Sequence, residues 1–245
     1  MRDLHLEYLI QDTLDSDNRV WVIGDIHGYI ETLRSLIENL NLGSKDIVIC
    51  LGDMVDRGPD SAGVVKLFME KENLYSLKGN HEQMLLMDWE ETNGLGNYSH
   101  DGFWSSLSPL SREDMIEIMT FIRFLPTEII LDKFRLVHAG YCDMPYTESL
   151  EQQTDIERLW SRDIFTVNYP FDQERTVIVG HTIIQNYGVI GDNEVWNSTK
   201  LLKDGRASAI GIDTGIYLQK EGNPRITAIE LGSGKIISQK RVDVN

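Results

Sequence analysis

Short apolar runs alternate with amphipathic stretches through the first third of the chain. The apolar runs are rich in β-branched residues and predict buried strands at residues 19–24, 46–52 and 73–77. Between them, apolar residues recur at helical spacing and predict helices at residues 30–42 and 61–71, with Gly43 as the stop signal of the first helix. This order of strand, helix, strand, helix and strand is typical of a parallel sheet of the α/β class.

The pattern changes between residues 82 and 126, where Met, Trp, Leu and acidic residues are frequent. A helix is predicted at residues 112–125, and we interpret the whole stretch as a helical insertion packed beside the sheet. Strand-like segments resume at residues 134–138, 176–180 and 209–212, and a hairpin is predicted from residues 226–231 and 235–241. No repeat, linker or low-complexity tract interrupts the chain, which predicts a single domain over residues 1–245.

Composition and charge narrow the class of protein. The chain has 245 residues, of which 41% are hydrophobic, and this suits one compact domain with a sizeable core. Its formal net charge of −16 disfavours binding to nucleic acid or to an anionic membrane surface, because both are polyanions. No apolar run approaches the ~18 residues that a membrane helix needs, the first residues do not resemble a secretory signal, and only two cysteines are present. We therefore expect a cytoplasmic monomer that has no nucleic-acid or membrane partner.

Five polar clusters stand directly after predicted strands. Their sequences are GDIHG at residues 24–28, GDMVDRG at 52–58, GNHE at 79–82, HAG at 138–140 and GHT at 180–182. Because the carboxyl ends of strands meet along one edge of an open α/β sheet, we expect the five clusters to converge there. Any one of them alone is more often a turn or a satisfied polar residue. Their order, and the intervals of 28 residues from Asp25 to Asp53 and 27 residues from Asp53 to Asn80, fit successive strand–helix crossovers.

The clusters offer six potential metal ligands, namely Asp25, His27, Asp53, Asn80, His138 and His181. Carboxylate, imidazole and amide oxygen donors without any thiolate suit divalent Mn, Fe or Zn, and do not suit a structural zinc site of the Cys type. Six donors exceed what one catalytic ion uses while it keeps an open position. The sequence therefore predicts two divalent ions that are bridged by one carboxylate.

Taken together, the five motifs resemble those of the phosphoprotein phosphatase family of metallophosphoesterases, and in particular the compact bacterial and phage lambda-type serine/threonine phosphatases. The motifs extend from about residue 20 to residue 215. The resemblance implies a calcineurin-like, four-layer α/β fold, with central β-sheets flanked by helices and the metals at the carboxyl ends of strands. It also implies hydrolysis of phosphoserine and phosphothreonine monoesters in a phosphoprotein or phosphopeptide, with phosphotyrosine left open, by direct attack of a metal-activated hydroxide.

The resemblance further assigns a role to each site residue. Asp25 and His27 would hold the first metal, Asp53 would bridge both metals, and Asn80, His138 and His181 would hold the second, with Mn as the expected ion. His81, oriented by Asp56, would be the general acid, and Arg57 and Arg162 would bind phosphate oxygens. The segment Asp213-Thr214-Gly215 resembles a late motif of the family and is interpreted as a structural loop near the site. Two divalent ions and two arginines would outweigh the acidic groups Asp25, Asp53 and Asp56, so an acidic chain could still bind a phosphate ester.

Two alternatives stay open. Symmetrical dinucleoside tetraphosphate hydrolases share the GDxHG and GNH elements, but they tend to lack the equivalent of Asp56 and to carry GNHD, whereas this chain has Glu82 at that place. Other small phosphoesterases belong to the same alternative. An inactive scaffold is the second alternative, and it would be expected to have lost at least one ligand. All six ligands are present here.

Overall fold

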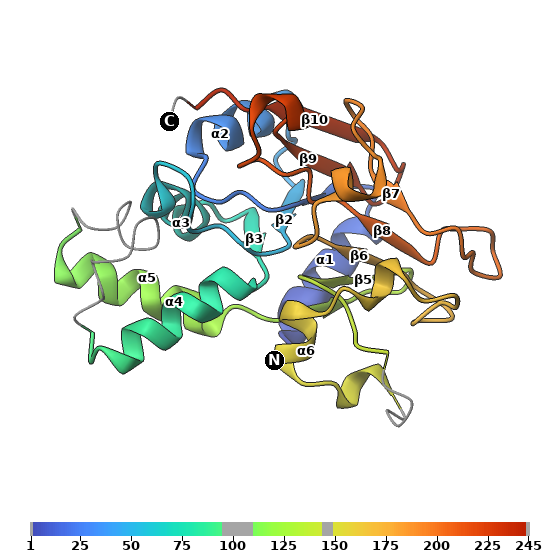
Figure 1. Ribbon diagram of the computed structural model, residues 1–245, viewed down its shortest axis with the longest axis horizontal. Helices are drawn as coiled ribbons and strands as arrows, with labels where there is room; N and C mark the ends of the chain where they lie inside the picture. The colour runs from blue at the N-terminus through green and yellow to red at the C-terminus, as the bar shows by residue number, and fades with distance from the viewer. Residues whose placement is uncertain (1, 95–109, 144–148, 244–245) are drawn as a thin grey trace.

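The computed structural model describes residues 2–94, 110–143 and 149–243, and these residues contain two five-stranded sheets. The strands of the first sheet are β1 (Val20–Ile23), β2 (Ile47–Cys50), β3 (Leu74–Ser76), β9 (Arg225–Glu230) and β10 (Ile236–Lys240). Those of the second sheet are β4 (Glu128–Ile130), β5 (Phe134–Val137), β6 (Thr176–Val179), β7 (Trp196–Asn197) and β8 (Ala209–Gly211). The sheet orders are β10–β9–β1–β2–β3 and β4–β5–β6–β8–β7 (Figure 1). The central strands β1, β2 and β3, and likewise β5, β6 and β8, run parallel, while the outer pairs are antiparallel.

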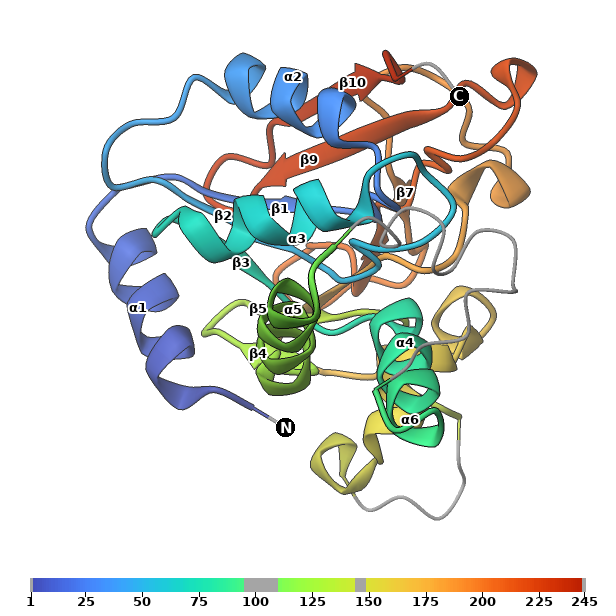
Figure 2. The same ribbon diagram turned by 90° about the vertical axis from the view of Figure 1, so that its left-hand side faces the viewer.

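Helices cover the outer face of the first sheet. The α-helices are α1 (Leu4–Asp15), α2 (Ile30–Leu40), α3 (Ser61–Glu70), α4 (Asn80–Glu91), α5 (Arg112–Phe124) and α6 (Asp155–Trp160), and the 3-10 helices are η1 (Leu150–Gln152), η2 (Asp163–Phe165), η3 (Ile184–Tyr187) and η4 (Lys220–Gly222). Figure 2 shows α2 over β9 and β10, and α3 alongside β3 and next to α2, with α5 below it. Apolar side chains of α2, α3 and α5 share one buried cluster with the first sheet.

Strands β1 and β2 of the first sheet bury both of their faces, which is why their sequences are apolar without interruption. In β1, Val20 and Val22 point into the cluster between the two sheets, and Trp21 and Ile23 point into the cluster beneath the helices. In β6, Ile178 joins the cluster between the sheets, while the side chains on either side of it face a third cluster under the segment that follows β5. Helices, sheet, sheet and outer segment make four layers, and the α/β fold predicted from the sequence is confirmed.

The ends of the helices follow from local side-chain chemistry. The carboxylate of Asp60 accepts a hydrogen bond from Gly63 N at the start of α3, and the Ser111 hydroxyl accepts one from Asp114 N at the start of α5. The prediction that this helix extends to residue 42, with Gly43 as its stop signal, is wrong by two residues, because α2 ends at Leu40 and Asn41 already adopts the left-handed conformation with φ 46°. Asn tolerates that conformation better than other non-glycine residues do.

The stretch predicted to be a helical insertion, residues 82–126, contains most of α4 and all of α5, while residues 95–109 lie outside the described residues. Helix α4 is less separate than predicted, because it begins at Asn80 inside the GNHE cluster. The terminal hairpin of β9 and β10 is confirmed. Helices α1 and α6 and strands β4 and β7 were not predicted from the sequence. Among the helices of the described ranges, none has the length and apolar character needed to cross a membrane.

Candidate metal centre and active site

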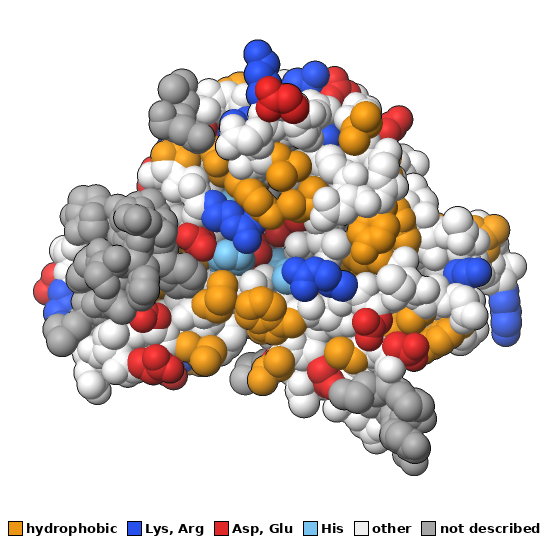
Figure 3. Space-filling view, viewed as in Figure 1, with side chains coloured by type: hydrophobic (Ala, Val, Ile, Leu, Met, Phe, Trp, Pro, Cys, Tyr) orange, Lys and Arg blue, Asp and Glu red, His pale blue; other side chains and the backbone are white. Residues whose placement is uncertain are grey.

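The five polar clusters meet at the carboxyl ends of strands from both sheets. Asp25 and His27 follow β1, Asp53 follows β2, and Asn80 opens α4 just after β3. From the second sheet, His138 follows β5 and His181 follows β6. Figure 3 shows His side chains in a hollow near the middle of one face, with basic and apolar side chains around it. The structure therefore brings together all six predicted metal ligands.

The first group of donors surrounds the Nε2 atom of His27. This nitrogen lies 3.8 Å from Asp25 Oδ2 and 3.7 Å from Asp53 Oδ2, and all three side chains are buried. The Nδ1 atom of His27 lies 3.0 Å from Val55 O, to which it donates, so Nε2 carries the lone pair that faces the carboxylates. Burial and the nearby Arg57 lower the pKa of His27, which keeps the imidazole neutral and able to bind a metal.

The second group of donors surrounds the amide oxygen of Asn80. Asn80 Oδ1 lies 2.9 Å from His138 Nε2 and 2.9 Å from His181 Nδ1, and Asp53 Oδ1 lies 3.4 Å from the same His138 nitrogen. His138 donates a hydrogen bond from Nδ1 to Leu51 O at 2.9 Å, so its Nε2 atom carries a lone pair. That lone pair faces Asn80 Oδ1, which is also an acceptor. Two acceptors at this distance repel one another unless a cation lies against both. Asp53 thus offers one oxygen to each group, as a bridging carboxylate would.

Charge supports the same interpretation. Burial, followed by the charges of Asp213 and Asp53, raises the pKa of Asp25, and burial also raises the pKa of Asp53 and that of Asp213. The Oδ2 atom of Asp213 is buried and has no hydrogen-bond partner among the described residues. Several carboxylates crowded into one buried space, beside neutral imidazoles, form a donor set that fits divalent cations. The residues present could therefore hold two such ions that share Asp53.

His81 differs from the other histidines because it has a carboxylate partner. Its Nδ1 lies 2.7 Å from Asp56 Oδ2, which fixes the tautomer in which Nε2 faces the site. Burial lowers the pKa of His81, but the hydrogen bond to Asp56 and the charge of Asp53 outweigh burial, so the pKa is raised. His81 Nε2 lies 3.8 Å from Asp53 Oδ2, at the edge of the first donor group. The arrangement places a proton donor beside the carboxylate that the two donor groups share.

The two arginines lie at the same hollow but are held differently. The Nη1 atom of Arg57 lies 2.9 Å from His27 Nε2, and its Nη2 atom lies 3.0 Å from His81 Nε2. The positive guanidinium therefore faces the ring nitrogens of two imidazoles. Arg162 is exposed, and after burial it is the largest cause of the low pKa of His181, which is about 3. Both arginines thus bring positive charge to the donor groups, as the sequence predicts.

The backbone around the site is unusual. Five of the predicted site residues have a positive φ, namely His27, Asp53, Asp56, Arg57 and His181. Such φ values are uncommon for non-glycine residues and are retained when the surroundings fix them. Here the buried Glu82 carboxylate accepts hydrogen bonds from the backbone N–H groups of Asp53, Met54 and Gly79 at 2.7–2.8 Å. In the sequence Glu82 only distinguishes this chain from the GNHD-type hydrolases, and the structure gives it this physical role.

Two further residues of the site were missed or underestimated. Asp213 was interpreted as part of a structural loop, and its Oδ1 does accept from Gly215 N at 2.9 Å, but the carboxylate is also buried beside Asp25. Tyr217 was not predicted at all, and its ring lies 3.8 Å below the guanidinium carbon of Arg57. No motif marks Tyr217 in the sequence.

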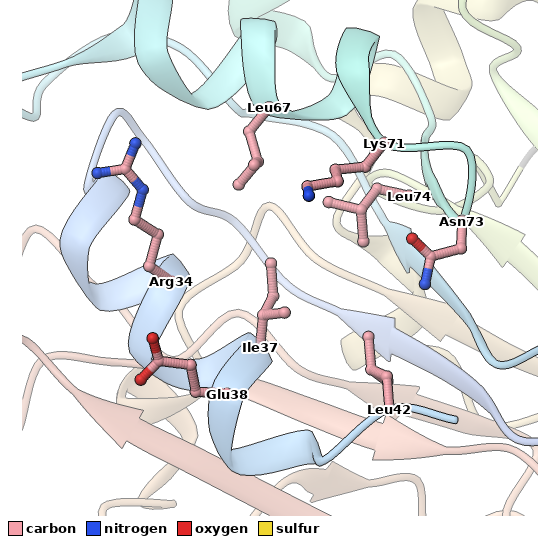
Figure 4. Close-up of a pocket in the computed structure, with 8 residues that line it drawn as sticks. All are labelled: Arg34, Ile37, Glu38, Leu42, Leu67, Lys71, Asn73 and Leu74. Atoms are coloured by element: carbon pink, nitrogen blue, oxygen red, sulfur yellow. The ribbon is translucent and has the colours of Figure 1, made fainter. Parts of the chain in front are cut away.

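A cavity of about 310 Å³ elsewhere in the described structure contains none of these residues. It lies between α2 and α3 and is lined by apolar side chains such as Ile37 and Leu67, with Arg34, Glu38 and Lys71 among its charged residues (Figure 4). It offers no histidine or converging carboxylates, so the chemistry belongs to the hollow at the strand ends.

The fold and the two donor groups define a metallophosphoesterase, and the chain belongs to the calcineurin-like phosphoesterase family, whose profile matches residues 18–211. Among bacterial relatives it is similar to the serine/threonine-protein phosphatase 2 of Salmonella typhimurium, with 29% identity over 217 residues that cover 83% of this chain and 98% of that protein. It is also similar to the symmetrical bis(5'-nucleosyl)-tetraphosphatase of Wigglesworthia glossinidia brevipalpis, with 41% identity over 69 residues, which cover 27% of this chain and 25% of that protein. A solved structure described as a putative diadenosine tetraphosphatase has the same fold, with a TM-score of 0.66, 22% identity and coverage of 93% of this chain and 95% of the other. The resemblance inferred from the motifs is confirmed at the level of the family.

Proposed function

We propose that the protein is a Mn²⁺-dependent phosphatase that hydrolyses phosphoserine and phosphothreonine in proteins or peptides. The observation that carries the proposal is the pair formed by His81 and Asp56, at 2.7 Å. A serine or threonine alkoxide is a strongly basic leaving group, so its departure requires a well-placed acid. A nucleotide or phosphate leaving group is far less basic and needs such an acid less.

Each remaining residue has a role in this proposal. Asp25 and His27 would hold one divalent ion, Asn80, His138 and His181 would hold the other, and Asp53 would offer an oxygen to each. When bound, the two ions supply hydroxide near neutral pH and polarise the phosphoryl group. Arg57 and Arg162 orient the phosphate by charge-assisted hydrogen bonds, and His81 delivers its proton from Nε2 to the departing oxygen.

Cleavage of dinucleoside tetraphosphates is the second candidate function. It is favoured by the local 41% identity to a symmetrical bis(5'-nucleosyl)-tetraphosphatase, although that match covers 27% of this chain, against 83% for the serine/threonine phosphatase. An inactive scaffold is disfavoured, since the ligands, the acid pair and both arginines are all present at one hollow.

The test is phosphate release from a phosphoserine peptide and, in parallel, cleavage of diadenosine tetraphosphate. Both reactions are run with metal-stripped protein, with and without added Mn²⁺, using wild type, His81→Asn and the control His5→Asn. His5 is exposed on α1, outside the candidate site. Calorimetric titration of Mn²⁺ into the stripped protein gives the stoichiometry independently of activity.

The expected result is Mn²⁺-dependent release from the peptide in preference to the dinucleotide, binding of two ions, loss of activity in His81→Asn and normal activity in His5→Asn. Preferential cleavage of the dinucleotide would replace the proposed substrate while leaving the metal centre in place. Binding of Mn²⁺ without activity on either substrate would support the scaffold and refute the proposal.

A further inference from the structure

Tyr217 lies in the loop between β8 and β9 and forms one wall of the candidate site. Its half-buried ring lies 3.8 Å from the guanidinium carbon of Arg57, the distance of a cation–π contact. The same ring meets His27 edge-on, with 5.2 Å between ring centroids. Tyr217 therefore contacts both a proposed phosphate-binding residue and a proposed metal ligand.

The other contacts of the Arg57 guanidinium cannot persist in the loaded enzyme. Its two terminal nitrogens donate to His27 Nε2 and His81 Nε2, at 2.9 and 3.0 Å. A lone pair that binds a metal cannot also accept an N–H bond, and a nitrogen that carries the catalytic proton cannot accept one either. The working states of His27 and His81 thus both release Arg57.

No carboxylate within the described ranges forms an ion pair with the Arg57 side chain. Asp56 lies next to it in sequence, but its Oδ1 accepts from the backbone N of Arg57, and its Oδ2 is bonded to His81. An ion pair with a carboxylate would also fix the guanidinium, but it would occupy the N–H donors and neutralise the charge that a phosphate group needs. An aromatic face fixes it through the π-surface and leaves the N–H edges free for phosphate oxygens.

We infer that Tyr217 is a positioning residue that holds the Arg57 guanidinium flat, with its N–H edges directed at the substrate phosphate. The inference rests on the phosphate-binding role given to Arg57 in the proposed function. The cation–π contact is made by the aromatic ring, so phenylalanine should keep most of the effect of tyrosine on Arg57. The contact equally requires a planar guanidinium on the other side, which lysine does not provide.

The experiment is a double-mutant cycle with Tyr217→Phe, Tyr217→Leu, Arg57→Ala and the double variant Arg57→Ala/Tyr217→Leu, all loaded with Mn²⁺. The control is Tyr75→Leu, which removes a half-buried tyrosine on β3. Among the described residues, the ring of Tyr75 makes no cation–π contact with an arginine. Two quantities are measured: the dissociation constant of inorganic phosphate by calorimetry, and kcat and KM for p-nitrophenyl phosphate. Neither depends on which natural ester the enzyme prefers, so this test can fail independently of the substrate assignment.

Tyr217→Leu should weaken phosphate binding and raise KM by about tenfold, which corresponds to about 1.4 kcal/mol, with a smaller change in kcat. Tyr217→Phe should stay within about twofold of wild type, as should Tyr75→Leu. In the Arg57→Ala background, Tyr217→Leu should have no further effect, because residues that act through one another are not additive. The inference would be overturned if the losses of phosphate affinity in Arg57→Ala and Tyr217→Leu were additive in the double variant. It would also be overturned if Tyr217→Phe and Tyr217→Leu lost equal affinity, or if Arg57→Ala bound phosphate as tightly as wild type.

Discussion

The pair formed by His81 and Asp56 makes a prediction that depends on the leaving group. Asp56→Asn keeps the shape of the side chain, and its amide oxygen can still accept from the backbone N of Arg57, as Asp56 Oδ1 does now at 2.8 Å. It removes the charge that holds His81 Nδ1 at 2.7 Å and that raises the pKa of His81. A hydrogen bond to a charged group contributes about 1.5–3 kcal/mol. Because about 1.4 kcal/mol is a factor of ten in rate, kcat for a phosphoserine peptide should fall about 10- to 150-fold.

The assay compares that peptide with p-nitrophenyl phosphate, whose phenolate leaves without a proton. If Asp56 acts by keeping His81 protonated, kcat for the aryl ester should fall by less than about threefold in Asp56→Asn, a far smaller decrease than that for the peptide. Asp60→Asn serves as the matched control, since Asp60 lies in the same loop but only caps α3. Equal losses for the two esters in Asp56→Asn would refute the assignment of His81 as the general acid, and would point instead to a disturbed metal centre.

Two further predictions concern packing and pH. A Cβ atom on Gly79 would lie 2.1 Å from Asp53 Oδ1, so Gly79→Ala should displace the shared carboxylate and lower kcat/KM at least about a hundredfold. The control is Gly232→Ala, whose added Cβ atom would meet only the flexible side chain of Glu230, and its kcat/KM should equal that of wild type. Burial raises the pKa of Asp46, but its hydrogen bonds from the backbone and guanidinium of Arg19 outweigh burial and lower it. The stabilisation by this carboxylate is therefore complete above the unfolded pKa of about 3.9 and is lost as the pH falls through the lower folded value. Urea unfolding should show Asp46→Asn destabilised by about 1–2 kcal/mol at pH 7, with the difference shrinking below about pH 4; a difference that does not change with pH would contradict this reasoning.

The sequence predicts the central strands well because both of their faces are buried. In β1, Val22 lies between the sheets and Ile23 lies under the helices, so every position of the strand is apolar and its sequence is recognisable as a buried strand. The elements that were missed have the opposite character. Helix α1 buries Leu6 and Ile10 but exposes Leu4 and Tyr8, so its apolar residues do not form one stripe. Strand β7 has two residues, and no periodicity can be read from two positions.

The candidate site was predictable where a residue type carries its chemistry wherever it lies. Asp, His and Asn after strands are potential ligands in any fold of this class, and glycine next to them marks tight turns. Tyr217 could not be found in this way, because its role depends on stacking against Arg57, which is 160 positions away in the chain. Asp213 was visible in the sequence, but its effect on Asp25 depends on burial, which appears only when the two sheets pack.

The charges at the hollow are more finely balanced than the sequence indicated. From the sequence alone, two divalent ions and two arginines stand against the three acidic groups Asp25, Asp53 and Asp56. The structure adds the buried carboxylates of Asp213 and Glu82, so seven positive charges, from two divalent ions, two arginines and a protonated His81, face five negative ones when all groups are ionised. Without the ions, burial raises the pKa values of Asp25, Asp53, Asp213 and Glu82 and so favours protonation of these carboxyl groups. Only the two arginines and His81 then remain to attract a phosphate dianion, in a chain that carries a net charge of −16. The cations thus supply most of the positive charge that the site offers to a phosphate group. Binding of the substrate, and not only its cleavage, should therefore depend on the metal ions.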